Sequence, residues 1–453
     1  MARSPSARSA ATPAASTSPT YDRGVIAPTT LDPAAIPAAQ ARIRRALIAE
    51  VALGSTGYIA AITIGTLVAQ DLLGSTTLAG VPSATVVLGA SSGSILLSSL
   101  MARRGRRPGL VLGYAIAVVG ALIAASAVVA RSFPLLIVGT ILLGWGNSAN
   151  QLSRYAAADM VPPSKRANAI GLIVWASTVG AVIGPSLVAP AGALARGLGL
   201  PELAGPYLVP VVAVTLSAIL SFVLLRPDPM ALADHAITGA DPGQSAPLAE
   251  IFRRPIVIAA IVALIAGQFT MVLVMTMTPL HMTQHGHDLT AVGLVLSAHT
   301  FGMYALSPIS GRLVGRLGIL PTIFLGTAVL VTASLMAAFA PPSGGLVLGL
   351  ALFLLGFGWN LGFVAGSSLL SAGLEIAERT RVQGVADALI WATAAIASFG
   401  SGLVVQAASY TTLGLLGAGF VAVAIWILAL RRRTVMVALR PALPLLDALE
   451  AEA

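Results

Sequence analysis

Cysteine is absent from this chain of 453 residues, which excludes disulfides, iron–sulfur clusters and thiolate metal sites. Charged residues make up only 9% of the sequence, whereas soluble domains carry roughly a quarter. Hydrophobic residues make up 57%, so too little polar surface exists to cover a soluble fold. The composition therefore predicts a polytopic helical membrane protein.

Aromatic residues are also scarce, at 5%, and Lys165 is the only lysine, so arginine supplies nearly all the positive charge. The net charge of +9 does not indicate nucleic-acid binding, because the arginines flank apolar segments as topology signals do. We find no phosphate-binding loop and no nucleophile paired with a base, so the sequence does not predict an enzyme or a bound cofactor.

Long apolar runs dominate the rest of the chain. Each is long enough to cross about 30 Å of hydrocarbon at 1.5 Å per residue. The sequence therefore predicts an all-α membrane protein. Its twelve predicted transmembrane helices cover residues 44–69, 78–102, 109–130, 134–159, 167–194, 205–225, 254–282, 289–313, 320–340, 343–371, 382–408 and 412–430.

Arginine-rich loops fix the predicted orientation. They alternate with loops that carry little positive charge beyond Arg131 and Arg196. Because positive loops stay in the cytosol, both termini are expected there. The arginine-rich positions are Arg42, Arg44, Arg45, Arg103, Arg104, Arg106, Arg107, Lys165, Arg166, Arg226, Arg253, Arg254, Arg312, Arg316, Arg379, Arg381 and Arg431 to Arg433.

The chain repeats itself. "SSLMARRGRR" from Ser98 is matched by "GRLVGRLGIL" from Gly311, and "LLGWG" from Leu142 by "LLGFG" from Leu354. Parallel repeats of six helices are typical of transporters that alternate access to a site between the halves. The predicted units are a disordered cytosolic tail (1–40), a first half (41–226), a linker (227–250), a second half (251–433) and a cytosolic tail (434–453).

The chain resembles the major facilitator superfamily over nearly all of residues 41 to 433, which implies the major facilitator fold. That family's loop motif, G-x-L-x-D-R-x-G-R-R, is matched at Leu100, Arg103, Gly105, Arg106 and Arg107, and in the second half at Gly311, Leu313, Arg316 and Gly318. Ala102 and Gly315 replace the acidic residue of the two copies, which puts the usual conformational latch in doubt.

The fifth predicted helix carries glycines and a proline spaced as in antiporters of the superfamily, which favours export. Glycines four apart also allow close helix packing, and we give that interpretation more weight. The residues are Gly171, Gly180, Gly184 and Pro185.

Methionine and histidine gather between residues 271 and 303. Met271 and Met275 lie one turn apart on the seventh predicted helix, as His299 and Met303 do on the eighth. In an antiparallel hairpin, residues at equal depth have a constant index sum, and this holds for Met275 with His299 and for Met271 with Met303. The four side chains are therefore expected in two layers near the membrane midplane.

Thioether and imidazole donors suit Cu(I). The spacing also resembles the CcoA-like copper importers, the CalT branch of the superfamily, which implies copper as the transported substrate of this site. The alternative is that these methionines only fill space. A second group would capture metal outside or simply be a solvated loop: Met277, His281, Met282, His285 and His287.

Other polar groups lie within the predicted spans. A stripe on the fourth helix, with a repeat counterpart on the tenth, is expected to line the cavity: Asn147, Asn150, Gln151, Arg154 and Asn360. Arg154 would repel a cation and is expected on the cytosolic side of the site. Asp159, Asp387 and Glu50 are expected to pair with loop arginines, and Asp387 is also the candidate for proton coupling.

The sequence thus predicts a monomeric transporter in a bacterial cytoplasmic membrane, in contact with lipid, that takes up copper. The alternatives are a proton-coupled exporter of drugs or small metabolites and a membrane sensor without turnover. Nucleic acid is not an expected partner.

Overall fold

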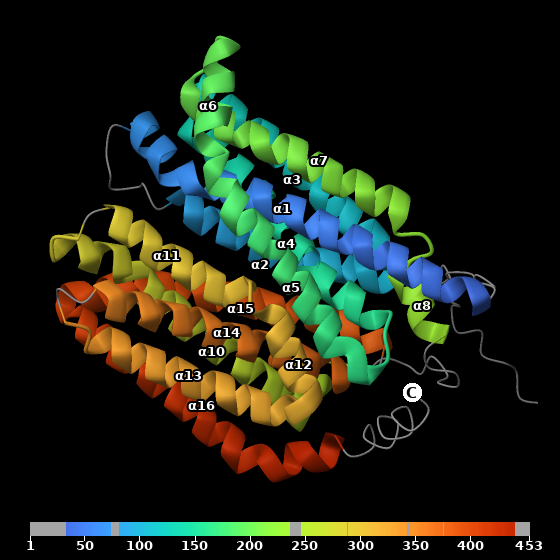
Figure 1. Cartoon of the computed structure of the whole chain (residues 1–453). Coiled ribbons are helices and arrows are strands. Elements are labelled where there is room, and N and C mark those ends of the chain that lie inside the picture. Colours follow the sequence, from blue (N-terminus) through green and yellow to red (C-terminus); the bar gives the residue numbers. More distant parts are fainter. Residues whose placement is uncertain are drawn as a thin grey trace, which may run out of the picture.

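The structure is a computed structural model that describes residues 33–73, 81–235, 246–287, 289–341, 345–374 and 376–439, and these are almost entirely helical (Figure 1). Most of the predicted terminal tails and the middle of the linker lie outside this range. The long helices are α1 (Ile36–Leu73), α2 (Val81–Arg104), α3 (Arg106–Val129), α4 (Phe133–Asp159), α5 (Arg166–Ser186), α7 (Gly205–Leu224), α10 (Pro255–Gln284), α11 (Leu289–Tyr304), α13 (Ile319–Ala338), α14 (Gly345–Ala372), α15 (Ile376–Ala407) and α16 (Tyr410–Leu439).

Shorter helices modify the predicted spans. The predicted fifth span continues past a break as α6 (Val188–Gly197), and the predicted eighth is divided into α11 and α12 (Ser307–Leu317). The linker holds α8 (Pro229–His235) and α9 (Leu248–Ile251). α1 begins earlier than expected, at Ile36, and α16 continues to Leu439.

Ten of the described helices are long and apolar enough to cross a membrane, against the twelve predicted spans. The difference has two physical reasons. α11 and α12 have 16 and 11 residues, and each is shorter than the roughly 20 that a span needs. α4 has 27 residues, but its polar stripe lowers its hydropathy.

The two halves pack alike. In the first, α4 packs on α2 and α3, and α1 packs on α5 and α7. In the second, α14 packs on α11 and α13, and α10 packs on α15 and α16. Gly105 and Gly318, which the sequence repeat aligns, have φ of 93° and 89°, a conformation that glycine adopts without strain.

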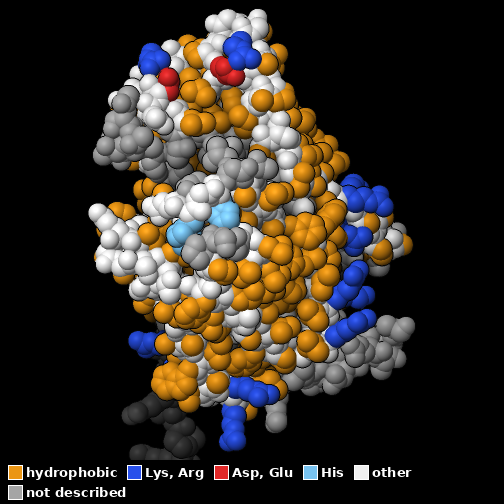
Figure 2. Space-filling view, turned by 60° about the vertical axis from the view of Figure 1, so that its left-hand side comes forward, with side chains coloured by type: hydrophobic (Ala, Val, Ile, Leu, Met, Phe, Trp, Pro, Cys, Tyr) orange, Lys and Arg blue, Asp and Glu red, His pale blue; other side chains and the backbone are white. Residues whose placement is uncertain are grey.

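The halves meet along two seams, α2 against α15 and α5 against α12. The end of the bundle that carries Arg103 to Arg107, Lys165, Arg166, Arg379 and Arg431 to Arg433 is called the arginine-rich end below. In Figure 1 it lies on the right, near α8, and α6 marks the opposite end. Figure 2 shows a broad apolar band on the flank, as a lipid-facing surface requires, with Lys and Arg side chains mainly along its right-hand edge and lower rim.

Candidate functional site

A buried ion pair joins the two halves at the centre of the molecule. Arg154 of α4 donates from Nη2 to Asp387 Oδ1 of α15 across 2.6 Å, and the two side chains are 1% and 2% exposed. The Tyr155 hydroxyl accepts from the same guanidinium at 3.0 Å. Charges this deeply buried need close partners, because removing them from water is costly. The pair therefore links α4 of the first half to α15 of the second half in the described state.

Aromatic rings surround this ion pair, although aromatic residues are scarce in the chain. The Arg154 guanidinium carbon lies 4.2 Å from the ring centre of Tyr155 and 4.4 Å from that of Phe363. Phe363 stacks on Trp359 at 4.6 Å, and Tyr304 meets Trp359 edge-on at 6.0 Å. Trp359 and Phe363 are four residues apart on α14, so they share one face of that helix.

A small cavity of about 10 Å³ lies beside Arg154, roughly the space of one water molecule. Its walls come from both halves of the molecule. They are formed by Val51, Asn150, Gln151, Arg154, Ile173, Val174, Ser177, Tyr304 and Phe363. Two amides, a guanidinium and two aromatic rings therefore converge on the plane where the halves meet.

The predicted polar stripe of α4 has divided roles. Gln151 and Arg154 face the interface, whereas Asn150 donates to Ser55 Oγ of α1 at 2.8 Å as well as lining the cavity. The Asn147 amide nitrogen is buried and has no hydrogen-bond partner among the residues that the structure describes. Asn360 is fully buried and donates to the Met303 carbonyl at 2.6 Å, so it stabilises the break between α11 and α12.

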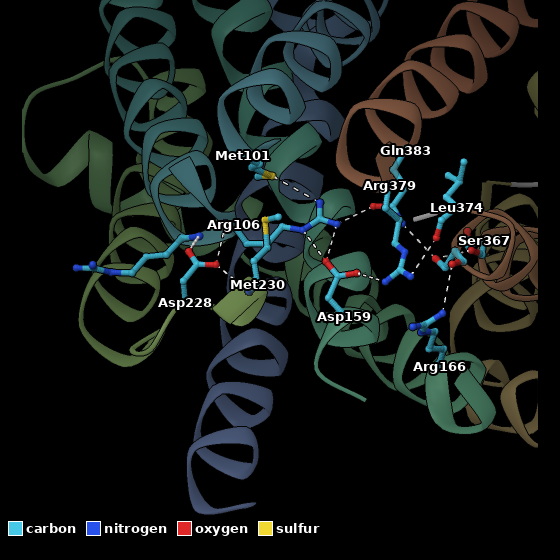
Figure 3. Close-up of polar contacts among 12 residues, drawn as sticks. Met101, Arg106, Asp159, Arg166, Asp228, Met230, Ser367, Leu374, Arg379 and Gln383 are labelled. Atoms are coloured by element: carbon cyan, nitrogen blue, oxygen red, sulfur yellow. Dashed lines mark hydrogen bonds and ion pairs between the residues drawn. The ribbon is translucent and has the colours of Figure 1, made fainter. Parts of the chain in front are cut away.

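A second ionic cluster joins the halves at the arginine-rich end (Figure 3). Asp159 of α4 accepts from Arg106 Nη2 at 2.7 Å and from Arg379 Nη1 at 3.2 Å. Arg106 also donates to Gln383 Oε1 at 2.7 Å. Because Arg379 and Gln383 belong to α15, these bonds must break before this end can open. Arg106, Asp159, Arg379 and Gln383 are called the latch below.

The sequence put such a latch in doubt because Ala102 and Gly315 replace the motif's acids. In the first repeat, Asp159 of α4 accepts the Arg106 guanidinium in place of the motif's own acid. The expectation that Asp159 pairs with loop arginines is confirmed. Arg316 of the second repeat aligns with Arg103 of the first, and both side chains are exposed.

Asp228, which the sequence reading missed, positions Arg106. Its carboxylate accepts from the backbone N–H of Arg106 at 3.1 Å and of Arg107 at 2.9 Å, and from that of Met230 at 2.9 Å. It therefore caps α3 from a distant segment. Burial raises the pKa of the Asp228 carboxyl, and the three N–H donors offset part of that rise. Nothing in the local sequence "RPDP" indicates this partner.

Two other carboxylates depart from the prediction that they pair with loop arginines. Asp387 pairs with Arg154 inside the bundle. Glu50 of α1 is fully buried and accepts hydrogen bonds from Ser153 at 2.9 Å and from Ser221. Its contacts lie within the first half, whereas those of Asp387 cross between the halves.

The methionines of the predicted metal site lie in one apolar cluster. Met271 and Met303 are buried in it, and Met275 packs against it. His299 is 1% exposed, and its Nδ1 lies 2.9 Å from the Leu352 carbonyl oxygen. Its Nε2 is buried and, among the described residues, has no hydrogen-bond partner. The main neighbour of α11 is α14, not α10, so the hairpin that motivated the two layers is not the principal packing here.

The outer group is partly assembled. The rings of His281 and His285 lie 4.3 Å apart, and His281 stacks on Tyr410 at 4.2 Å. Met282 is buried, Met277 packs on the apolar cluster, and His287 lies near Gly345. Figure 2 shows histidine side chains together on the end opposite the arginine-rich end. Among the described residues, no three His, Cys, Asp or Glu side chains form a group that could hold a metal ion.

The glycines of the predicted α5 motif lie where helices touch. A Cβ added at Gly180 would come within 2.4 Å of Ser55 in α1, and one at Gly171 within 2.6 Å of the Ser307 carbonyl oxygen. Gly184 faces Ile59, and Pro185 lies within the last turn of α5. This agrees with the packing interpretation, and Gly311 likewise faces Ala167 across the α5–α12 seam.

Residues 46–386 match the family described as the Major Facilitator Superfamily. The chain belongs to that superfamily. It is therefore a multi-pass membrane transporter and not an enzyme, with the helical fold expected from its repeats. The superfamily resemblance seen in the loop motif is thus confirmed.

Two relatives and one solved structure illustrate the likeness. The chain is 38% identical over 370 residues to the uncharacterized MFS-type transporter YdeG of Bacillus subtilis, covering 80% of this chain and 86% of the relative. It is 31% identical over 389 residues to the riboflavin transporter RfnT of Brucella anthropi, covering 84% of this chain and 93% of that relative. The transporter FucP superposes with a TM-score of 0.68 at 18% identity, covering 85% of this chain and 98% of FucP.

Proposed function

We propose that this superfamily member transports a small organic solute with a planar heteroaromatic ring, by alternating access between its halves. The observation that carries the proposal is the Arg154–Asp387 pair at the interface, with Phe363 against the guanidinium, Trp359 stacked on Phe363 and Tyr304 edge-on to Trp359. Binding that must be coupled to opening and closing is best placed where both halves contribute side chains.

The chemistry of these side chains suits such a ring. Aromatic rings stack with one another in offset or edge-on arrangements, and a guanidinium adds attraction to a ring face. The amides of Asn150 and Gln151 offer donors and acceptors to polar edges of the solute. The relative named as a riboflavin transporter supports the same solute class, since a flavin is a planar ring system with hydrogen-bonding edges.

The closed latch indicates which end of the molecule is shut in the described state. If the arginine-rich end faces the cytosol of a bacterium, the described state is closed to the cytosol. In uptake, a solute would then enter from outside and leave to the cytosol after the latch breaks. A proton-coupled exporter would run the same cycle in the opposite sense.

Transport of radiolabelled riboflavin and smaller heteroaromatic solutes tests the proposal, in bacterial cells that lack their own uptake system. Trp359→Leu and Phe363→Leu should each lower the initial rate roughly fivefold, because a stacking contact is worth about 1 kcal/mol. Phe353→Leu, on α14 but packed against Phe301 and Phe357, is the matched control and should transport like the parent. Equal rates in all three variants would contradict the aromatic site.

Copper uptake is the second candidate, and the unpaired Nε2 of His299 is the observation that favours it. Neutral imidazole with the thioethers of Met271, Met275 and Met303 is a donor set for Cu(I). Cellular copper content separates the two candidates, measured with the parent, with His299→Ala and with Met→Leu at each methionine. The organic-solute proposal expects equal copper in all strains, whereas a loss in His299→Ala with normal membrane insertion would favour copper.

A further inference from the structure

A second and larger cavity lies at the arginine-rich end, away from the central ion pair. Its volume is about 750 Å³, and both halves form its walls. The first half contributes Ser164, in the turn before α5, and Arg166, the first residue of α5. The second half contributes the ends of α12, α14 and α16 and the start of α13. Most of the lining is apolar and includes Leu317, Phe324 and Met436.

Two arginines face this apolar space. Arg432 of α16 is exposed, so it can reach a charged group at the membrane surface. Arg166 is 5% exposed; within the described part of the chain its Nε has no hydrogen-bond partner, and its Nη1 donates to the Ser371 carbonyl oxygen at 3.3 Å. A buried guanidinium with an unsatisfied N–H is costly, and an anion in the cavity would offset that cost.

The charge around Arg166 is unbalanced. Arg106, Arg166 and Arg379 are all at least 95% buried. The Asp159 carboxylate pairs with Arg106 and Arg379, and Asp228 accepts from the backbone N–H of Arg106 (Figure 3). Glu378, which is also buried, binds Arg254 with both carboxylate oxygens, and Asp387 is held by Arg154. Among the described residues, Arg166 is therefore left without a carboxylate partner of its own, and the Nε atoms of Arg166 and Arg379 have no hydrogen-bond partner.

We propose that this cavity binds an anionic phospholipid, with its phosphate at Arg166 and Arg432 and an acyl chain along Leu317, Phe324 and Met436. A lipid fits better than a free phosphate, because a small anion would leave the apolar walls unfilled. Basic pockets between transmembrane helices near the cytoplasmic face are suited to anionic head groups. Because α5 and α12 both contribute to the walls, the lipid favours the state in which the arginine-rich end is closed.

The test measures lipid retention by the purified full chain in neutral detergent, using native mass spectrometry. The probes are phosphatidylglycerol, phosphatidylcholine and inorganic phosphate. The parent should retain phosphatidylglycerol in preference to phosphatidylcholine. Arg432→Gln should weaken phosphatidylglycerol binding on the order of fivefold, since a cation near a lipid phosphate contributes about 1 kcal/mol. Arg433→Gln, at a position that is also exposed but does not line the cavity, should bind like the parent.

Gly315→Leu provides a variant that leaves every charge in place. A Cβ at Gly315 meets no atom within 4 Å, and Gly315 lines the cavity, so the leucine should fill the space without a clash. Gly419→Leu on α16 is the matched control, because its Cβ also meets no atom within 4 Å and Gly419 is exposed elsewhere. Gly315→Leu should lose the lipid and Gly419→Leu should keep it.

Three outcomes would overturn the assignment. Phosphatidylglycerol binding by Gly315→Leu equal to that of the parent would place the lipid elsewhere. Retention of inorganic phosphate equal to that of phosphatidylglycerol would identify a simple anion site. Residues 440–453 follow the cavity-lining Leu439 and are acidic. Binding of phosphatidylglycerol only after their removal would identify that segment as the occupant of the cavity. The measurement does not depend on which solute is transported, so it stands or fails independently of the proposed function.

Discussion

Arg154 and Asp387 lie 233 residues apart in the sequence, yet Nη2 of one and Oδ1 of the other are 2.6 Å apart in the bundle. Both are almost fully buried, and each belongs to a different half. A pair in this position must separate whenever the halves move apart at this depth. It is therefore part of the conformational cycle as well as of the candidate solute site.

Asp387→Asn should break this tie. It leaves the Arg154 guanidinium buried opposite a neutral amide, and such a loss typically costs about 3–5 kcal/mol. We expect a lower melting temperature in detergent and loss of transport. The charge-swapped double variant, Arg154→Asp with Asp387→Arg, should recover part of the melting temperature. If Asp387→Asn melts and transports like the parent, the pair has no role in either property.

The latch can be probed with a thiol reporter, because the chain has no cysteine of its own. Ser98 is 1% exposed, and a Cβ at Gly384 of α15 would overlap its hydroxyl, so Ser98→Cys reports separation of α2 from α15. Arg106→Gln in this background should raise the rate of thiol alkylation on the order of tenfold, for about 1.4 kcal/mol of lost stabilisation.

Arg103→Gln is the control for the latch experiment, since Arg103 lies on the same loop but is exposed. Its alkylation rate should match that of Ser98→Cys alone. A rate in Arg106→Gln no faster than in Arg103→Gln would show that the latch does not hold this end closed.

Asp228→Ala should destabilise the start of α3. The carboxylate satisfies two N–H groups at that helix end, and loss of such a cap typically costs about 1 kcal/mol. We expect a lower melting temperature and faster alkylation at Ser98→Cys, because Arg106 is no longer positioned. Asp71→Ala removes the exposed pair with Arg131 and should change little. Equal melting temperatures for the two variants would argue against the cap.

Glu50→Gln tests whether transport is coupled to protons. Its carboxylate contacts hydroxyl groups, so a neutral isostere should preserve packing and fold. If Glu50 carries the coupling proton, uptake driven by a pH gradient should fall by an order of magnitude or more, while exchange of labelled for unlabelled solute continues. Glu202→Gln, at an exposed ion pair with Arg196, is the control. Loss of exchange in Glu50→Gln would instead indicate a binding or structural role.

The sequence alone predicted the features that depend on local composition and on repetition. Apolar runs of sufficient length are enough to indicate spanning helices, because a bilayer leaves few other ways to satisfy the backbone. The repeat that aligns Gly105 with Gly318 likewise predicted two halves with matching contacts, and the loop motif indicated the superfamily. The sequence also indicated that Asp159 pairs with loop arginines.

Only the tertiary structure decided which helices are neighbours. Sequence spacing placed His299 opposite Met275 because consecutive helices were assumed to pack together, whereas α11 packs mainly on α14. Asp228 and Asp387 found partners more than 100 residues away, and the local sequence does not indicate either partner. The physical reason is that hydropathy is nearly uniform around these helices, so it does not select a packing partner. The partners of buried charges are set by long-range packing, which no short segment encodes.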